Sequence, residues 1–309
     1  MANIHKWALV PFLMEELRRM PLPHFTTRQI HCRLDPTTGY HISPVGEEIT
    51  YAKMQALRIP IDPEELLGEL QGDGHTFAHS SVAGLYRLHV DGKDHLLLVH
   101  QLDSHFTPIK GYVESHELGG LENALDRELA EELLLETWDG TLGYQREENY
   151  FGNPYGIPLV GSLRIIPAKP LQGLGLLRGH YQGVLLPAHA QFYFDALTNN
   201  IQIVFHYRLC LSGNTYSFVS LDHAEDHARG NDLVSVRYSD GANLFSLTKN
   251  RISGFRFAGY LNGLSQQPID TVTLGESVCT KKRRDTPKLI NLSSCLPLAR
   301  CRSERLMLL

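Results

Sequence analysis

The sequence predicts a mixed α/β protein, because a β-hairpin and an amphipathic helix follow one another near the middle of the chain. Two strand-like runs, residues 80–90 and 94–101, are joined by Asp-Gly-Lys, a typical hairpin connection. Leucines then recur at helical spacing from Leu121 to Leu133, which predicts a helix over residues 121–135 that packs between layers. We therefore expect an α/β domain over residues 76–265, with a mixed sheet flanked by helices.

Residues 1–75 precede this domain and are predicted to form an N-terminal extension. Apolar residues from Trp7 to Leu17 recur at helical spacing, although Pro11 interrupts the pattern, and this predicts a packing helix. Residues 62–70, DPEELLGEL, predict a short capped helix that begins at Asp62 or Pro63.

The segments beyond the central helix predict more strands and then an irregular end. Apolar runs predict strands at 157–166, 201–211 and 232–239, and residues 251–264 predict a closing helix despite their glycines. Residues 266–309 show no clear period and predict a loosely ordered tail. Its basic run at 281–284 is typical of a solvated surface, with a nuclear-localisation signal as the alternative.

Composition excludes several classes of protein. A length of 309 residues with 42% hydrophobic residues is enough for a sizeable core, and a net charge of −5 argues against a protein that coats nucleic acid or anionic membranes. Five scattered cysteines without a CxxC pair argue against a disulfide scaffold or a zinc ribbon. The first 20 residues hold no signal-like apolar core, and no run reaches the ~18 apolar residues of a membrane span. We expect a soluble cytoplasmic protein, with no membrane partner, for which a homodimer is a compatible state.

The predicted central helix gathers acidic residues beside its leucine stripe. Glu128, Glu131 and Glu132 fall in one arc, where their carboxylates repel one another and lose hydration near a buried face. A hard divalent cation such as Mg²⁺, which prefers oxygen ligands, relieves both problems. Arg127 lies four residues before Glu131, so it can orient that carboxylate. A solvated acidic face is the alternative interpretation of the same residues.

The segment 111–135 resembles the Nudix box, G-x5-E-x7-R-E-U-x-E-E-x-G-U, in which U is an aliphatic residue. Gly111 and Glu117 match the first two fixed positions, and the second half is matched by Arg127, Glu128, Leu129, Glu131, Glu132 and Leu135. Two departures stand out: nine residues instead of seven separate Glu117 from Arg127, and Leu134 stands where the family has Gly.

Because this spacing is longer than in the family, the glutamate of the box can be assigned in two ways. Counting forward from Gly111 makes Glu117 the box glutamate, whereas counting back from Arg127 places Gly119 there. We favour the forward count, because GYVESHE follows directly on a strand-like segment and glycine makes a bulge at 118–120 easy.

The resemblance implies a Nudix-like fold over residues 76–265 and a hydrolase that cleaves the pyrophosphate bond of a nucleoside diphosphate derivative. Mg²⁺ or Mn²⁺ would be the cofactor and would lower the pKa of the attacking water. The ligands implied for the metal are Glu128, Glu131, Glu132 and the Gly111 carbonyl. Arg127 would hold the glutamates in place, Glu131 would act in catalysis, and Glu117 would assist from the loop.

Two further groups are secondary candidates. Glu225 or Asp226 would serve as a distal catalytic base of the kind that Nudix enzymes recruit, with a solvated loop or a zinc site of Asp222, His223 and His227 as alternatives. Tyr150, Phe151 and Tyr155 follow the box and are candidates to stack on a base, although loop aromatics also pack against their own domain.

Two rival hypotheses remain beside the hydrolase. A catalytically weak Nudix-like module would sense a nucleotide and regulate a partner, which the irregular box and the flanking segments favour. An unrelated α/β protein with an acidic helix is the other. For the hydrolase and for the sensing module, the expected partner is a small nucleoside diphosphate derivative, not a nucleic acid.

Overall fold

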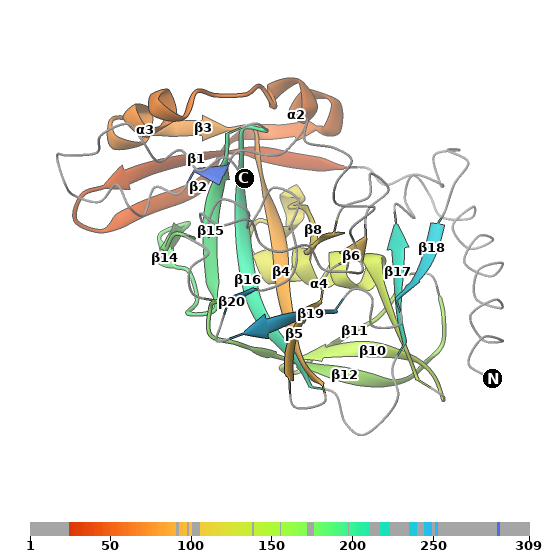
Figure 1. Cartoon of the computed structure of the whole chain (residues 1–309). Helices are drawn as coiled ribbons and strands as arrows, with labels where there is room; N and C mark the ends of the chain where they lie inside the picture. Colours follow the sequence, from red (N-terminus) through yellow and green to blue (C-terminus); the bar gives the residue numbers. More distant parts are fainter. Residues whose placement is uncertain are drawn as a thin grey trace.

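The computed structural model shows a strand-rich mixed α/β protein with two mixed β-sheets (Figure 1). The structure describes residues 25–90, 93–97, 99–100, 106–137, 139–154, 156–171, 176–196, 198–210, 217–222, 235–239, 244–248, 251–252 and 289–290. Among these residues three α-helices and one short 3-10 helix accompany the sheets, and no helix is long and apolar enough to cross a membrane. The prediction of a mixed α/β protein is confirmed.

The smaller sheet has five strands in the order β14-β13-β2-β1-β3. The pair β13–β2 is parallel and the other pairs are antiparallel. Residues of the expected N-terminal extension thus share a sheet with residues 179–185. Its strands are β1 (Thr26–Asp35), β2 (Gly39–Thr50), β3 (His75–Phe77), β13 (Gly179–Tyr181) and β14 (Val184–Leu185).

Two short helices connect β2 to β3. Helix α2 (Tyr51–Leu57) begins after Thr50, whose hydroxyl accepts from the Lys53 amide at 3.4 Å. Helix α3 (Pro63–Gln71) begins after Asp62, whose carboxylate accepts from the amides of Glu64 and Glu65 and so satisfies two of the free donors of the first turn. The predicted helix at 62–70 is therefore confirmed.

The larger sheet has fourteen strands, and its central pair is the parallel pair β4–β16. A second parallel pair joins β10 to β12, and β6 (Val99–His100) and β7 (Phe106–Thr107) form a separate two-stranded sheet. The fourteen strands are β4 (His79–Val90), β5 (Lys93–Leu97), β8 (Ile109–Tyr112), β9 (Leu133–Thr137), β10 (Gly140–Arg146), β11 (Asn149–Phe151), β12 (Leu159–Pro167), β15 (Ala190–Asp195), β16 (Asn200–Cys210), β17 (Ser217–Asp222), β18 (Ser235–Ser239), β19 (Leu244–Thr248), β20 (Arg251–Ile252) and β21 (Leu289–Ile290).

The predicted hairpin and the later strands are present. Strands β4 and β5 are antiparallel, with Val90 opposite Lys93. Strands β12, β16 and β18 occupy the segments predicted at 157–166, 201–211 and 232–239, with small shifts at their ends.

The predicted helix over 121–135 is too long by three residues. Helix α4 (Leu121–Glu132) ends at Glu132, and Leu133 begins β9. The reason is tertiary: Leu133, Leu134 and Leu135 are all buried, and β9 pairs with β10 on one side and β17 on the other. A strand covered on both faces is uniformly apolar, which a helical count does not distinguish from a buried helix.

Two predictions for the C-terminal part meet described residues only in short pieces. Arg251 and Ile252 form strand β20 against β19, so the helix predicted for 251–264 is wrong at its start, because Ile252 pairs with Leu247. In the expected tail, β21 pairs with β15. The rest of both segments lies outside the described residues, as does the helix expected between Trp7 and Leu17.

Two buried histidines make the stability of the fold depend on pH. The side chains of His79 and His206 are fully buried. Burial, aided by the charge of Arg58 near His79 and of Arg87 near His206, lowers the pKa of each imidazole from 6.5 to about 3. Between these pH values the unfolded chain binds a proton that the folded chain does not, so stability decreases as the pH falls through this window.

We expect the free energy of unfolding to decrease by up to about 1.4 kcal/mol per pH unit for each of these histidines as the pH falls below 6.5. Urea unfolding of the wild-type protein and of His79→Leu at several pH values measures the effect. The variant lacks one titrating group, so its stability should depend less steeply on pH. Parallel pH profiles for the two proteins would contradict the assignment.

Candidate active site

Helix α4 carries the acidic residues of the candidate site and packs against strands β4 and β8 (Figure 1). Its leucine stripe, Leu121, Leu125 and Leu129, lies in the hydrophobic core. Burial of this stripe fixes the rotation of the helix about its axis, and Glu128 then faces the backbone of β8. A methyl group on Gly111 would overlap the Glu128 carboxylate, so only glycine permits this approach.

Arg127 joins three glutamates. Its Nε donates to Glu117 Oε1 at 2.8 Å and its Nη2 donates to Glu117 Oε2 at 3.2 Å, a two-pronged contact. Its Nη1 lies 2.8 Å from Glu128 Oε1 and donates to Glu131 Oε2 at 3.0 Å. The remaining Nη2 proton is directed to the Tyr112 carbonyl at 3.0 Å, so the guanidinium is also tied to strand β8.

The charge of Arg127 is maintained by these partners. Burial by itself lowers the pKa of the guanidinium, but the carboxylates of Glu128, Glu117 and Glu131 outweigh burial and raise its pKa above the ordinary value. A permanent cation therefore lies among the three carboxylates and reduces their mutual repulsion.

Glu117 reaches Arg127 from the loop that precedes the helix. It lies in the 3-10 turn η1 (Ser115–Glu117), and its side chain is 5% exposed. The Glu114 amide donates to Glu117 Oε2 at 3.0 Å, which holds the carboxylate in place beside the guanidinium. Gly119, the alternative from the backward count, has only open space where a side chain would begin. The forward count predicts that Glu117 assists from the loop, and this contact is compatible with that prediction.

The oxygens at this site are hard donors of the kind that Mg²⁺ and Mn²⁺ prefer. Glu128 and Glu131 are neighbours, because their carboxylates contact the same Arg127 nitrogen, and Gly111 lies against Glu128. Glu132 follows on the same helix and is half-buried. In the described part of the chain, no group of three or more acidic, His or Cys side chains is arranged so that it could hold a metal ion. Arg127 engages the carboxylates in this arrangement.

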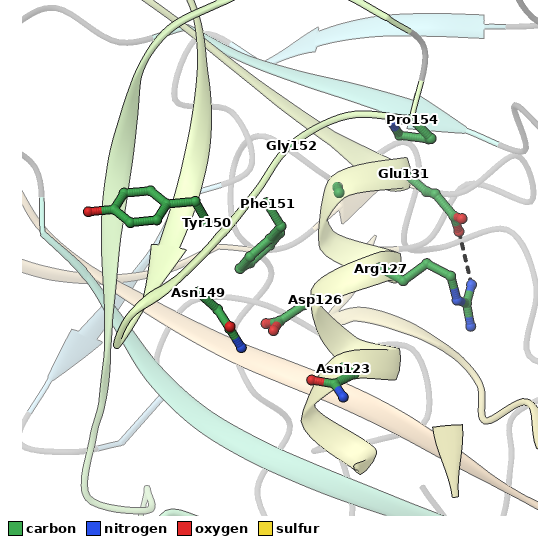
Figure 2. Close-up of a pocket in the computed structure, with 10 residues that line it drawn as sticks. Asn123, Asp126, Arg127, Glu131, Asn149, Tyr150, Phe151, Gly152 and Pro154 are labelled. Carbon is green, nitrogen blue, oxygen red and sulfur yellow. Dashed lines mark hydrogen bonds and ion pairs between the residues drawn. The ribbon is translucent and has the colours of Figure 1, made fainter. Parts of the chain in front are cut away.

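A pocket of about 320 Å³ adjoins Arg127 and Glu131 (Figure 2). In Figure 2, Arg127 and Glu131 extend to one side of α4, while Asp126 points toward strand β11 and the Phe151 ring. The pocket is therefore aromatic at one end, which also holds the Asp126 carboxylate, while the charged groups of Arg127 and Glu131 extend away from the rings. Its lining consists of Asn123, Asp126, Arg127, Ala130 and Glu131 from the helix and of Asn149, Tyr150, Phe151, Gly152 and Pro154 from β11 and the loop after it.

The aromatic candidates differ in their surroundings. Phe151 stacks on Tyr144 with ring centroids 5.5 Å apart, so it packs against its own domain while it lines the pocket. Tyr150 is 70% exposed, and its ring extends away from α4 and from Phe151 (Figure 2). Tyr155 lies outside the described residues.

A buried ion-pair network that the sequence did not reveal holds the other side of α4. Arg146 of β10 binds both oxygens of Asp126, with its Nη2 at 2.6 Å from Oδ2. Its Nη1 lies 3.4 Å from Glu122, which also accepts from His189 at 2.9 Å and from Tyr207. The only sequence signal was the pair of acids at 122 and 126, one helical turn apart, and their partners come from distant parts of the chain.

The distal candidates remain predictions. Asp222 is the last residue of β17, and Glu225, Asp226, His223 and His227 lie outside the described residues.

Comparison of the chain with protein-family models, curated proteins and solved structures gives no match. The assignment of a function therefore depends on the residues and the geometry of this site.

Replacement of Gly111 by Ala should displace the Glu128 carboxylate, because the added methyl group has no other space. We expect a loss of about 1–3 kcal/mol in the free energy of unfolding and a weaker response of the melting temperature to Mn²⁺. Gly119→Ala is the matched control, since a methyl group there meets nothing within 4 Å. Equal stability of the two variants would show that the Glu128 carboxylate moves away from residue 111 without cost and is not fixed there.

Proposed function

We propose that this protein has a Nudix-like fold and is a metal-dependent hydrolase that cleaves the pyrophosphate bond of a nucleoside diphosphate derivative. The observation that carries the proposal is the contact of one guanidinium, Arg127, with a loop glutamate and two helix glutamates. Glycine at 111, where the chain meets one of these carboxylates, adds support. These are the positions at which the sequence resembles the Nudix box.

The chain's own residues would act together with Mg²⁺ or Mn²⁺. To hold the cation, the carboxylates of Glu128 and Glu131 would have to turn from Arg127 and converge with Glu132 and the Gly111 carbonyl. When bound, the cation would shield the diphosphate charge and lower the pKa of a water molecule. Arg127 would hold the carboxylates in place.

Glu131 is the best candidate to orient or deprotonate the attacking water. Its side chain is 21% exposed, whereas those of Glu117 and Glu128 are 5% and 8% exposed. Among the partners of Arg127 it is therefore the one most accessible to water and substrate.

The pocket supports a substrate with an uncharged planar part. The charge of Asp126 is balanced by Arg146, so this end of the pocket does not favour an anion. Phe151 offers a ring face within the pocket and Tyr150 an exposed ring at its edge, and Asn123 and Asn149 offer both donors and acceptors. A nucleobase would fit this end while its diphosphate lies toward Glu131.

A second candidate is a Nudix-like module that binds the same ligand without turnover. The observation that favours it is that Arg127 already engages the carboxylates of Glu117, Glu128 and Glu131. In this case the pocket would sense a nucleotide derivative and transmit its presence to a partner.

A screen of nucleoside diphosphate derivatives with Mg²⁺ or Mn²⁺, with phosphatase-coupled phosphate release as the readout, tests the hydrolase. We expect Glu131→Gln to fold normally and to reduce kcat about 100-fold, equivalent to about 2.7 kcal/mol of barrier. Glu117→Ala should reduce kcat less, about tenfold, because Glu117 acts through Arg127. Divalent-independent activity in the wild type would contradict the proposal. Tight ligand binding without turnover would favour the sensing module, and full activity of Glu117→Ala would show that the forward count is wrong.

Tyr150→Ala should raise KM about tenfold and change kcat little, because the exposed ring would contribute stacking to both the bound substrate and the transition state. Tyr150→Phe is the control, since it retains the ring and loses only the hydroxyl. If both variants have the wild-type KM, the base does not stack on Tyr150.

A further inference from the structure

The loop between β8 and α4, residues 113–120, is bound at both ends by side chains from the region of the smaller sheet. At its start the hydroxyl of Thr27 in β1 donates to the Val113 carbonyl at 2.7 Å. Near its end the side-chain amide of Gln182, in the turn between β13 and β14, donates to the Leu118 carbonyl at 2.7 Å. This segment carries Glu117, and we refer to it as the box loop.

The two anchors are firmly placed. Thr27 and Val113 are fully buried, so loss of the hydroxyl would leave a buried carbonyl without its donor, which is costly. Gln182 has a positive φ of 50°, and Gly183 after it has a φ of 80°, as in the tight turns of β-hairpins. The backbone N–H of Gln182 donates to the Ile42 carbonyl at 2.8 Å, so β2 fixes the turn from which the side chain extends.

The box loop is internally rigid between these anchors. The Glu117 amide donates to the Glu114 carbonyl at 2.9 Å, and the Gly120 amide donates to the Glu117 carbonyl at 2.8 Å. The Leu118 side chain is buried in the core. A shift of either anchor would therefore move Glu117 as part of one turn, together with its two-pronged contact to Arg127.

We propose that the smaller sheet positions the candidate active site, and that Thr27 and Gln182 are the positioning residues through which it acts. They set the place of Glu117, and Glu117 sets the orientation of Arg127 and of the carboxylates that Arg127 holds. The longer segment between Glu117 and Arg127 has a role in this arrangement, because Leu118 contributes the carbonyl that Gln182 binds. The catalytic part of this inference rests on the proposed function, whereas the restraint of the loop does not.

Hydrogen–deuterium exchange of peptides that cover residues 113–120 tests the restraint. Thr27→Val keeps the shape of the side chain and removes the donor, whereas Thr27→Ser keeps the donor. Gln182→Leu removes the second donor. We expect exchange of the box-loop amides to become about tenfold faster in Thr27→Val and in Gln182→Leu, as for the loss of one buried hydrogen bond, and to stay at the wild-type rate in Thr27→Ser.

Thr198→Val is the matched control for deletion of a threonine hydroxyl. The Thr198 hydroxyl donates to Asp195 at 2.6 Å in the turn between β15 and β16. This variant loses a hydrogen bond of similar length without touching the box loop, so it should leave box-loop exchange unchanged.

Steady-state kinetics on the substrate found in the screen tests the catalytic consequence. We expect kcat to fall about tenfold in Thr27→Val and in Gln182→Leu, with KM within about twofold. Thr27→Ser and Thr198→Val should keep the wild-type kcat, which separates positioning from a general loss of stability.

Two results would overturn the inference. Unchanged box-loop exchange in both donor-deletion variants would show that the smaller sheet does not hold the loop, whether or not the protein is a hydrolase. Faster exchange with unchanged kcat would show that the restraint does not position the site. A wild-type protein that hydrolyses nothing would instead contradict the proposed function, and the exchange rates would still decide whether the loop is restrained.

Discussion

The candidate site depends on the contacts that the Arg127 guanidinium makes with its glutamates. Glu117 and Glu128 are almost completely buried, and a buried carboxylate is very costly unless a cation and hydrogen bonds compensate it. Arg127 supplies the cation to both and to Glu131, and its remaining donor binds the backbone of β8. Helix, loop and strand therefore have compatible positions only when this one side chain is in place.

Two other constraints make that position possible. Gly111 allows the Glu128 carboxylate to lie against β8, which brings α4 close to the strand. On the far side of the helix, Arg146 binds Asp126 and approaches Glu122, so that α4 is held to β10 as well. Burial alone lowers the pKa of Arg146, but Asp126 and Glu122 outweigh it and raise that pKa, so this second cation is permanent too. The leucine stripe sets how far the helix is buried in the core, and the two arginines set its orientation.

The smaller sheet is connected to this arrangement through the box loop. Thr27 comes from residues that the sequence suggested only as an N-terminal extension, and Gln182 comes from a turn more than 60 positions beyond the loop that it binds. Strands β1 and β2 were not predicted, although the buried residues Ile30 and Cys32 alternate with polar residues in β1, which is the pattern of a half-buried strand. The sequence carried a signal for the strand, whereas its pairing in one sheet with residues 179–185 follows only from the tertiary structure.

The amino-acid sequence by itself determined the local structure wherever short-range chemistry is decisive. Asp62 and Pro63 specify the start of α3, the Asp-Gly-Lys segment joins the β4–β5 hairpin, and the leucine spacing specifies α4 as far as Glu132. The same local spacing placed Arg127 and Glu131 one helical turn apart, so their contact was predictable.

Only the tertiary structure decided the remaining features, because each depends on residues far apart in the chain. The helix ends at Glu132 because Leu133–Leu135 pair with β10 and β17. The buried pair of Asp126 and Arg146 forms only when β10 lies beside α4. The contact of Glu117 with Arg127 was likewise not fixed by counting along the chain. The fold of the 113–120 loop brings the Glu117 carboxylate to Arg127. Two buried charges of opposite sign stabilise one another only when the folded chain holds them in matching geometry.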